Sequence, residues 1–245
     1  MEFYWIDDTH LRVNGEKMLP EEAYKKYPKD ANKIKAFVKK SKTHEEKLFD
    51  FITSRRLESN TFSDEEEYSV KECCSKIKVK IEEIFKHLNI EGDSIQKQKR
   101  NAYVLFEYVI KNSNYDYRIM EEKRAVANDM FTQEVIDIYR CLCENRSVCT
   151  SDAAALSLMY RCAGIDSRHL TIAEKGDIPQ GVHEVVKMRF GDEIFICDPT
   201  LVRTCLEQGN IPDISPSVFA FTPNKFFEIL YPSKEIKVEH VPYVL

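Results

Sequence analysis

Two stretches decide the fold: residues 146–164, RSVCTSDAAALSLMYRCAG, and residues 181–200, GVHEVVKMRFGDEIFICDPT. The first begins as a polar connection and becomes apolar on nearly all sides after its first cysteine, which predicts a helix buried over most of its surface. Its last glycine stands where a C′ glycine would end that helix. The second holds two runs with a period of two around Gly191-Asp192, a pair suited to a type II′ turn. We therefore expect a buried helix followed by an antiparallel hairpin.

The rest of the sequence predicts helices before this region and short strands around it. Five of the seven glycines lie between Gly164 and Gly209, which separates a helical half from a turn-rich half. In the N-terminal half we expect a hairpin around Asn14-Gly15, a helix from about Ala31 to Arg56, and a helix with the capping box Ser63 and Glu66 that ends at Gly92. Two more helices follow: one is capped by Asp93 or Ser94 and carries Ile95, Ala102, Leu105, Phe106 and Val109, and the other covers Thr132–Cys143. In the C-terminal half we expect strands over Arg168–Ala173, Val182–Phe190 and Glu193–Cys197, a short helix from Thr222-Pro223 to Leu230, and an edge strand from Ile236.

The composition describes a core-forming chain without a strong charge bias. Its 245 residues fit one large domain or one domain with an extension, and 43% of them are hydrophobic. The 36 basic and 41 acidic residues leave a net charge of −5, and lysines alternate with glutamates. This balance argues against general attraction to nucleic acid or to an anionic membrane.

Two features of the sequence bear on the cellular location of the protein. No apolar run reaches the roughly 18 residues that span a bilayer. The first residues, Met1 to Asp8, contain no basic segment followed by an apolar one, which a secretory signal requires. We therefore expect a cytoplasmic protein with no membrane partner.

The eight cysteines raise the questions of a disulfide framework and of a zinc site, and we expect neither. A chain of this length builds a core without disulfides, and no export signal is visible. Zinc sites commonly use CxxC pairs, whereas the close pairs here are Cys73-Cys74 and Cys141-x-Cys143. We expect reduced thiols, no metal and no cofactor, with Cys73 and Cys74 in the core.

The hairpin register places a histidine beside an aspartate. If Gly191 and Asp192 form the turn, Phe190 pairs with Glu193, and Asp198 comes to lie opposite Val185. His183 precedes Val185 by two residues and so lies on the same face of the sheet. His183 and Asp198 are then diagonal neighbours, at a separation that polar side chains can bridge. A β-bulge would break this register.

Cys149 falls where the polar connection meets the buried helix. At a helix N-terminus the free N–H groups and the macrodipole stabilise a thiolate. A nearby imidazole can carry the proton, and a carboxylate can fix the orientation of the ring. The backbone N–H of Cys149 is placed to donate to an oxyanion. Cys149, His183 and Asp198 are therefore the candidate catalytic residues.

Each of the three residues also has a structural explanation. A buried cysteine at a helix start is often inert, a histidine is often a satisfied structural residue, and an aspartate before proline is often a turn residue. These alternatives stay open for each residue taken alone. The register that joins two of them favours a functional site.

The ordered motifs resemble those of the transglutaminase-like superfamily of cysteine enzymes. Its members open a small-residue helix with V-C and close it with G-I, as Val148-Cys149 and Gly164-Ile165 do here. They then carry a histidine that begins one strand and D-P-T at the end of the next, here His183 and Asp198-Pro199-Thr200. Bacterial members often have Y-D-Y upstream, here Tyr115-Asp116-Tyr117. The resemblance covers roughly Lys99 to Arg203.

The resemblance implies a fold and three residue roles. The fold is papain-like α+β, with the nucleophile helix packed on an antiparallel sheet. Cys149 is the nucleophile, His183 the base and Asp198 the orienting acid. The family's usual residues after the cysteine are replaced by Thr150-Ser151-Asp152, and its H-A-W-N by His183-Glu184-Val185-Val186. No EF-type calcium loop and no CxxC zinc pair is present.

We therefore expect an enzyme that hydrolyses amide bonds of a protein or peptide substrate through an acyl-enzyme. Acyl transfer to an amine or deamidation of glutamine, as in a transglutaminase, is one alternative. A catalytically silent protein-binding module on the same fold is the other. Residues 1–98 are expected to form a helical N-terminal region with a short hairpin, and residues 99–245 a transglutaminase-like catalytic domain.

Overall fold

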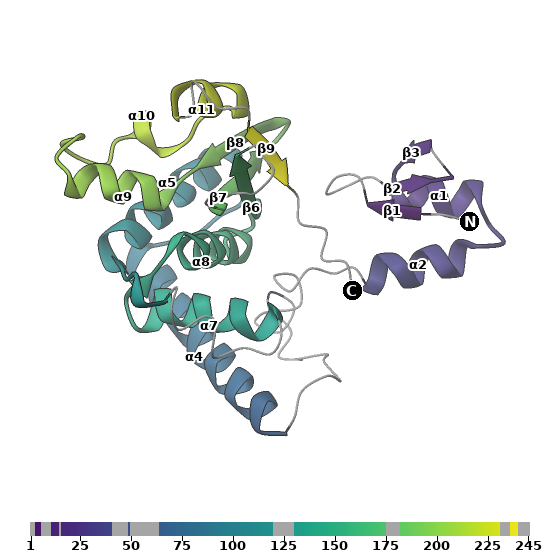
Figure 1. The fold of residues 1–245 in the computed structure, drawn as a ribbon, viewed down its shortest axis with the longest axis horizontal. Coiled ribbons are helices and arrows are strands. Elements are labelled where there is room, and N and C mark those ends of the chain that lie inside the picture. Colours follow the sequence, from purple (N-terminus) through teal and green to yellow (C-terminus); the bar gives the residue numbers. More distant parts are fainter. Residues whose placement is uncertain are drawn as a thin grey trace.

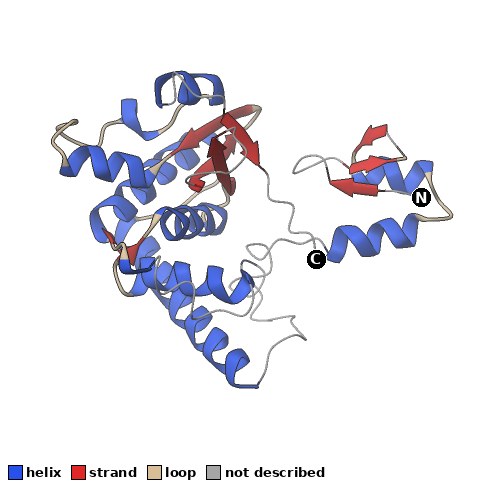
Figure 2. Ribbon diagram, in the orientation of Figure 1, coloured by secondary structure: helices blue, strands red, loops and turns tan. Residues whose placement is uncertain are grey.

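The computed structural model describes residues 3–5, 11–14, 16–40, 49, 64–119, 130–174, 182–230 and 236–239 (Figure 1). The structure contains both helices and small sheets, which agrees with the α+β fold class that the sequence predicts (Figure 2). The helices are α1 (Pro20–Lys26), α2 (Ala31–Lys40), α4 (Asp64–Leu88), α5 (Ile95–Asn112), α7 (Met130–Cys143), α8 (Cys149–Cys162), α9 (Pro199–Glu207), α10 (Pro216–Phe219) and α11 (Pro223–Leu230). The strands are β1 (Phe3–Trp5), β2 (Leu11–Val13), β3 (Glu16–Met18), β4 (Asn114–Tyr115), β5 (Arg146–Ser147), β6 (Asp166–Glu174), β7 (Val182–Phe190), β8 (Glu193–Cys197) and β9 (Ile236–Glu239).

The N-terminal unit is a three-stranded antiparallel sheet with two helices. β2 and β3 form the predicted hairpin, and Asn14 takes a positive φ of 50° between them. β1 pairs with the other side of β2, and the sequence did not predict it. A small core of Val13, Met18, Ala23 and Ile34 joins the sheet to α1 and α2. The unit thus buries apolar residues of its own.

α8 is the central element of the larger part of the chain. Every residue from Ser151 to Tyr160 is buried, as the all-round apolar pattern predicts. α8 packs against β6 and β7 on one side and against α7 on the other, and α7 packs on α4. Figure 1 shows these as layers, from the sheet through α8 to α7 and α4. Each fully buried side chain such as Leu156 contributes about 1.5–3 kcal/mol.

The core cluster around α8 takes residues from both sides of position 98. Ile77 of α4 and Phe106 of α5 belong to it together with Leu156. Residues 98 and 99 both lie inside α5, which runs without interruption from Ile95 to Asn112. α4 and α5 are therefore part of the packing that supports α8.

The main sheet has the strand order β8-β7-β6-β9, and every neighbouring pair is antiparallel. Phe190 pairs with Glu193 and the register continues to Val186 and Cys197, which confirms the predicted hairpin. Gly191 takes the positive φ, 60°, that the first position of a type II′ turn requires. β9 lies at the sheet edge, as expected.

The two faces of this sheet belong to different apolar clusters. Val186 and Met188 join the core around α8, whereas Val185 lies in a second cluster with Phe226 of α11. This division follows from the period of two along β7. α11 itself begins at Pro223, as the Thr222-Pro223 signal predicts.

Gly164 ends α8 as predicted. Its φ is 74°, its N–H donates to the carbonyl of Arg161 at 3.0 Å, and the N–H of Ile165 donates to Tyr160 at 2.9 Å. These two bonds form a Schellman motif, which satisfies the last carbonyls of the helix.

The predicted end of α4 at Gly92 is wrong. The helix ends at Leu88, and Asn89 takes the left-handed C′ position with a φ of 51°. The N–H of Ile90 donates to Phe85 at 2.9 Å and closes the same kind of motif. Asparagine tolerates this conformation better than other side chains, so the glycine that follows in the connection is not needed there.

The start of α5 decides between the two predicted caps. Ser94 is the N-cap, and its Oγ accepts a hydrogen bond from the N–H of Lys97 at 3.4 Å. Ile95, which the sequence pattern assigned to the apolar face, is 51% exposed. It occupies the first position of the helix, before the helix reaches the core.

Other differences concern short elements and undescribed residues. The sequence did not predict α1, α9 or α10. Ser63 and most of the segment expected to extend α2 to Arg56 lie outside the described residues, as does Gly15. Phe49 is described, and it packs against the core with Arg161 placed 4.7 Å from its ring centroid.

Candidate active site

Cys149 is the first residue of α8. The residue before it, Val148, is the N-cap and supplies no side-chain cap. The first N–H groups of a helix have no intrahelical carbonyl partner, and they point toward whatever lies before the helix. The Cys149 thiol is free and partly buried. Cys149 therefore sits where negative charge on sulfur is stabilised by backbone groups.

A short parallel bridge fixes how the chain reaches α8. β5 pairs with β4, with Asn114 opposite Arg146 and Tyr115 opposite Ser147. The N–H of Asp116 adds a bond to the carbonyl of Ser147 at 2.9 Å. This bridge places the Tyr115-Asp116-Tyr117 segment directly beside the start of α8.

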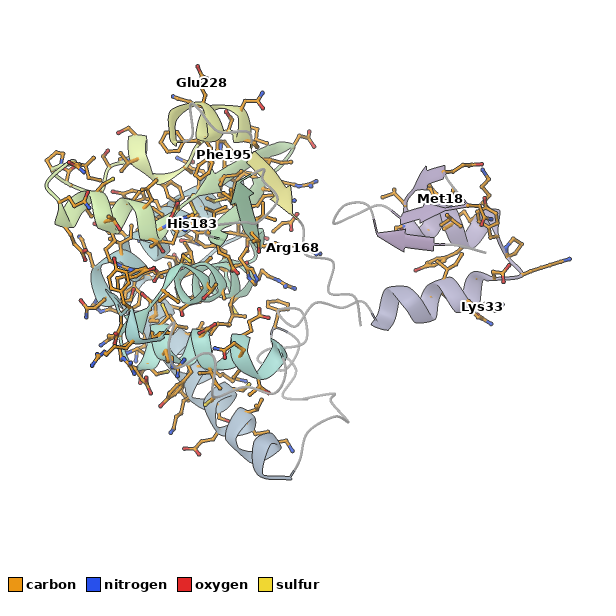
Figure 3. The ribbon with its side chains drawn as sticks, viewed as in Figure 1. Met18, Lys33, Arg168, His183, Phe195 and Glu228 are labelled. Atoms are coloured by element: carbon orange, nitrogen blue, oxygen red, sulfur yellow. The ribbon has the colours of Figure 1, made fainter. Side chains whose placement is uncertain are left out.

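His183, the second residue of β7, contacts Asp198. The His183 Nε2 lies 2.6 Å from the Asp198 Oδ2, and the two side chains are 27% and 2% exposed. Figure 3 labels His183 in the larger part of the chain, where β7 contacts α8. The contact between these two residues is the one that the hairpin register predicts.

Asp198 is held by a second contact, because it is also the N-cap of α9. Its Oδ1 accepts the N–H of Leu201 at 2.9 Å while its Oδ2 faces the imidazole. Pro199 occupies the first helical position. An aspartate followed by proline is a recognised helix start. The sequence therefore contains the signal for α9, although the helix was not among the predicted elements.

The imidazole also meets the thiol. Burial of His183 favours its neutral form, but hydrogen bonds to Asp198 and to the Cys149 side chain, with the charges of both groups, outweigh burial. Together they raise the pKa of His183 from 6.5 to about 10. The structure therefore brings all three predicted residues together, and the imidazole is positively charged at neutral pH.

Tyr115 lies beside the same sulfur, a position that the sequence did not reveal. Burial and the neighbouring Cys149 raise the pKa of Tyr115 to about 12, so its hydroxyl keeps its proton. The ring packs edge-on against Tyr117 with centroids 4.7 Å apart. Tyr117 is itself 75% exposed. An aromatic pair thus extends from the thiol toward solvent.

Asp116, between these tyrosines, anchors the segment. It accepts from Arg118 Nη2 at 2.6 Å and from Arg146 Nε at 2.9 Å. These bonds hold the pKa of the Asp116 carboxyl well below its usual range. The Asp116–Arg146 pair ties the segment to the strand that leads into α8.

A buried ion pair lies one helical turn after Cys149. Arg203 Nη1 donates to Asp152 Oδ2 at 2.8 Å and Nη2 donates to Asp152 Oδ1 at 2.9 Å. The two side chains are 4% and 0% exposed. Thr200 also donates to Asp152 Oδ2, at 2.7 Å. An aspartate next to alanines in a buried helix signals this cluster, but its partners Thr200 and Arg203 lie on α9, which the sequence pattern does not predict.

The described residues contain no group of three or more His, Cys, Asp or Glu side chains able to hold a metal ion. All eight cysteines are free. No helix in the described ranges combines the length and apolar character needed to cross a bilayer.

Comparisons with known proteins add little to this geometry. No family model matches the sequence, and no curated protein matches it. One similar solved structure is described as a crystal structure of a TGase, with a TM-score of 0.35 and 12% sequence identity. The match covers 60% of this chain and 36% of that one, so this chain spans about a third of its length.

Proposed function

We propose that this chain is a cysteine enzyme that cleaves amide bonds in a protein or peptide through an acyl-enzyme on Cys149. The observation that carries the proposal is the contact of one imidazole, His183, with both a thiol and a buried carboxylate. These groups come from three different elements. We assign the fold to the papain-like, transglutaminase-like class on the same grounds, and all three site residues fall within residues 99–245.

The first step is attack by the Cys149 sulfur on the amide carbonyl. The cationic imidazole and the start of α8 both stabilise negative charge on the sulfur. The backbone N–H of Cys149 donates to the oxygen that becomes negative in the tetrahedral intermediate. Because the pKa of His183 is about 10, the ring holds its proton at neutral pH and acts first as an acid. It donates that proton to the departing amine nitrogen, and the C–N bond breaks.

The second step releases the acyl group. His183 is now neutral and takes a proton from the incoming water while the oxygen attacks the thioester carbonyl. The C–S bond breaks and the acid leaves. An amine in place of water would give acyl transfer. Asp198 holds the ring in one orientation through both steps.

Selective alkylation tests the activated thiol. We expect iodoacetamide at neutral pH to label Cys149 first, because burial raises the pKa of six other thiols and keeps them protonated. Cys205 is the matched control, since it is also free and partly buried. Peptide mapping by mass spectrometry gives both rates in one sample. Equal, slow labelling of Cys149 and Cys205 argues against the proposal.

The fate of the acyl group requires a second assay. A glutamine-containing peptide is supplied with a labelled amine, and peptide fragments, ammonia and amine incorporation are measured together. Hydrolysis gives fragments or ammonia without incorporated label, and a transglutaminase incorporates the amine. If an electrophilic amide probe leaves the wild type unlabelled, and the wild type and Cys149→Ala capture the same partners, the chain is a binding module instead.

A further inference from the structure

One buried carboxylate joins the two helices that carry the site. Asp152 lies three residues after Cys149 in the first turns of α8. Its partners Thr200 and Arg203 lie in α9, which Asp198 caps. The same carboxylate thus holds the helix of the thiol and the helix whose N-cap contacts the imidazole.

The contacts around Arg203 extend this junction to two more elements. Its Nη1 donates to Ser147 Oγ of β5 at 3.2 Å, and its Nη2 donates to Ser113 Oγ after α5. Its Nε and Nη2 reach the carbonyls of Ile110 and Val109, both at 3.4 Å. These carbonyls belong to the last turn of α5, and the C-terminal end of a helix favours a positive charge. Arg203 therefore joins α5, β5, α8 and α9 at one point.

The geometry of this junction is directional. Two parallel N–H···O bonds between guanidinium and carboxylate fix distance and angle together, which a pair of apolar side chains does not. Buried ion pairs are weak contributors to stability, because desolvation offsets much of their attraction. The pair also leaves no net charge, so the Asp152 carboxylate does not oppose negative charge on the nearby sulfur.

We propose that Asp152, Thr200 and Arg203 are positioning residues that set the distance between the Cys149 sulfur and the His183–Asp198 pair. This inference rests on the proposed function of that site. Thr200 is the contact to test, because Thr200→Val keeps the shape of the side chain and removes only its hydroxyl. Arg203→Met alone would leave a buried unpaired carboxylate and is expected to unfold the protein.

The experiment measures alkylation of Cys149 by iodoacetamide in full-length Thr200→Val, Thr200→Ser and Thr204→Val. Thr204 is the matched control, since it lies one turn further along α9 and its hydroxyl bonds the Thr200 carbonyl at 2.9 Å, not Asp152. We expect Thr200→Val to slow alkylation of Cys149 by about tenfold, because small misplacements of reacting groups have large kinetic effects. Thr200→Ser restores the rate to within about twofold, and Thr204→Val does not change it by more than this.

Alkylation of the buried Cys197 separates positioning from loosening of the fold. If only the positioning is lost, alkylation of Cys149 slows and Cys197 stays protected from iodoacetamide. If the fold loosens, Cys197 becomes accessible and is alkylated. The inference is overturned if Thr200→Val labels Cys149 at the wild-type rate, or if Cys197 becomes reactive in the same variant. Failure of the proposed function is distinguishable, because it shows as equal labelling of Cys149 and Cys205 in the wild type.

Discussion

At the scale of single residues, the two oxygens of Asp198 have separate tasks. Oδ1 caps α9 through the Leu201 N–H, and Oδ2 faces the His183 ring. A carboxylate held at both oxygens cannot rotate away from the imidazole. Structural and chemical roles thus meet in one side chain, and the helix start supplies the orientation that the ring needs.

Two substitutions separate these tasks. Asp198→Asn keeps an oxygen for the cap and loses the charge, whereas Asp198→Ala loses both. We expect Asn to be more stable than Ala by about 1 kcal/mol, the usual contribution of a cap. Both variants should lose amide turnover, since neither keeps the imidazolium partner. Chemical denaturation and a turnover assay measure the two effects, and equal stability of the variants would contradict the capping role.

The raised pKa of His183 makes stability depend on pH. The folded protein holds this proton more tightly than the unfolded chain, whose pKa is 6.5. The stabilisation is fully present below pH 6.5, falls as the pH rises, and is lost once the pH passes about 10. We expect the free energy of unfolding of wild type minus that of His183→Gln to shrink over this window. Urea titrations at several pH values measure it, and a constant difference refutes the shift.

At the scale of elements, α8 and α4 are each closed by a left-handed residue. Gly164 ends α8 with a φ of 74°, and a Cβ added there would meet no atom within 4 Å. The cost of a side chain at this position is therefore that of the backbone alone. Asn89 has the same task at the end of α4.

Substitutions at these two positions are expected to affect stability differently. Gly164→Ala should destabilise the protein by about 1 kcal/mol, because alanine is strained at positive φ. Asn89→Gly should be neutral or slightly stabilising, because glycine adopts that conformation without strain. Thermal unfolding monitored by circular dichroism measures both. A fully tolerated Gly164→Ala would mean that α8 can end in another way.

The sequence predicted some elements well for identifiable reasons. β7 and β8 were recovered because a two-residue turn and a period of two fix the register without help from distant residues. That register is also why the contact of His183 with Asp198 was predictable. α9 was not predicted because its first residues, Asp198-Pro199-Thr200, were interpreted as part of the catalytic motif and not as a helix start. Tyr115 and the Asp152–Arg203 pair depend on contacts between residues far apart in sequence, which no local pattern encodes.

At the scale of the whole molecule, the apolar residues form separate clusters. The core around α8 draws its described members from Phe49 onward, whereas Val13, Met18, Ala23 and Ile34 form a core of their own. Removing residues 1–40 should therefore leave the unfolding of the remaining chain cooperative.

Calorimetry of the shortened chain tests this separation. We expect a single transition with a midpoint within about 5 °C of the full-length value, since only contacts outside the α8 core are removed. Alkylation of Cys149 in the same sample reports whether the site survives. Loss of the transition would show that the first 40 residues stabilise the core around α8.

The type II′ turn of the main hairpin lies at the opposite end of β7 from His183. Seven residue steps separate His183 from Phe190, which at about 3.4 Å a step is on the order of 24 Å. Gly191 and Asp192 are both exposed. A fluorophore, an affinity tag or a surface-tethering group joined at this turn would be carried on a rigid strand, far from the chemistry at its other end. The hairpin thus offers an attachment point for watching single molecules at work.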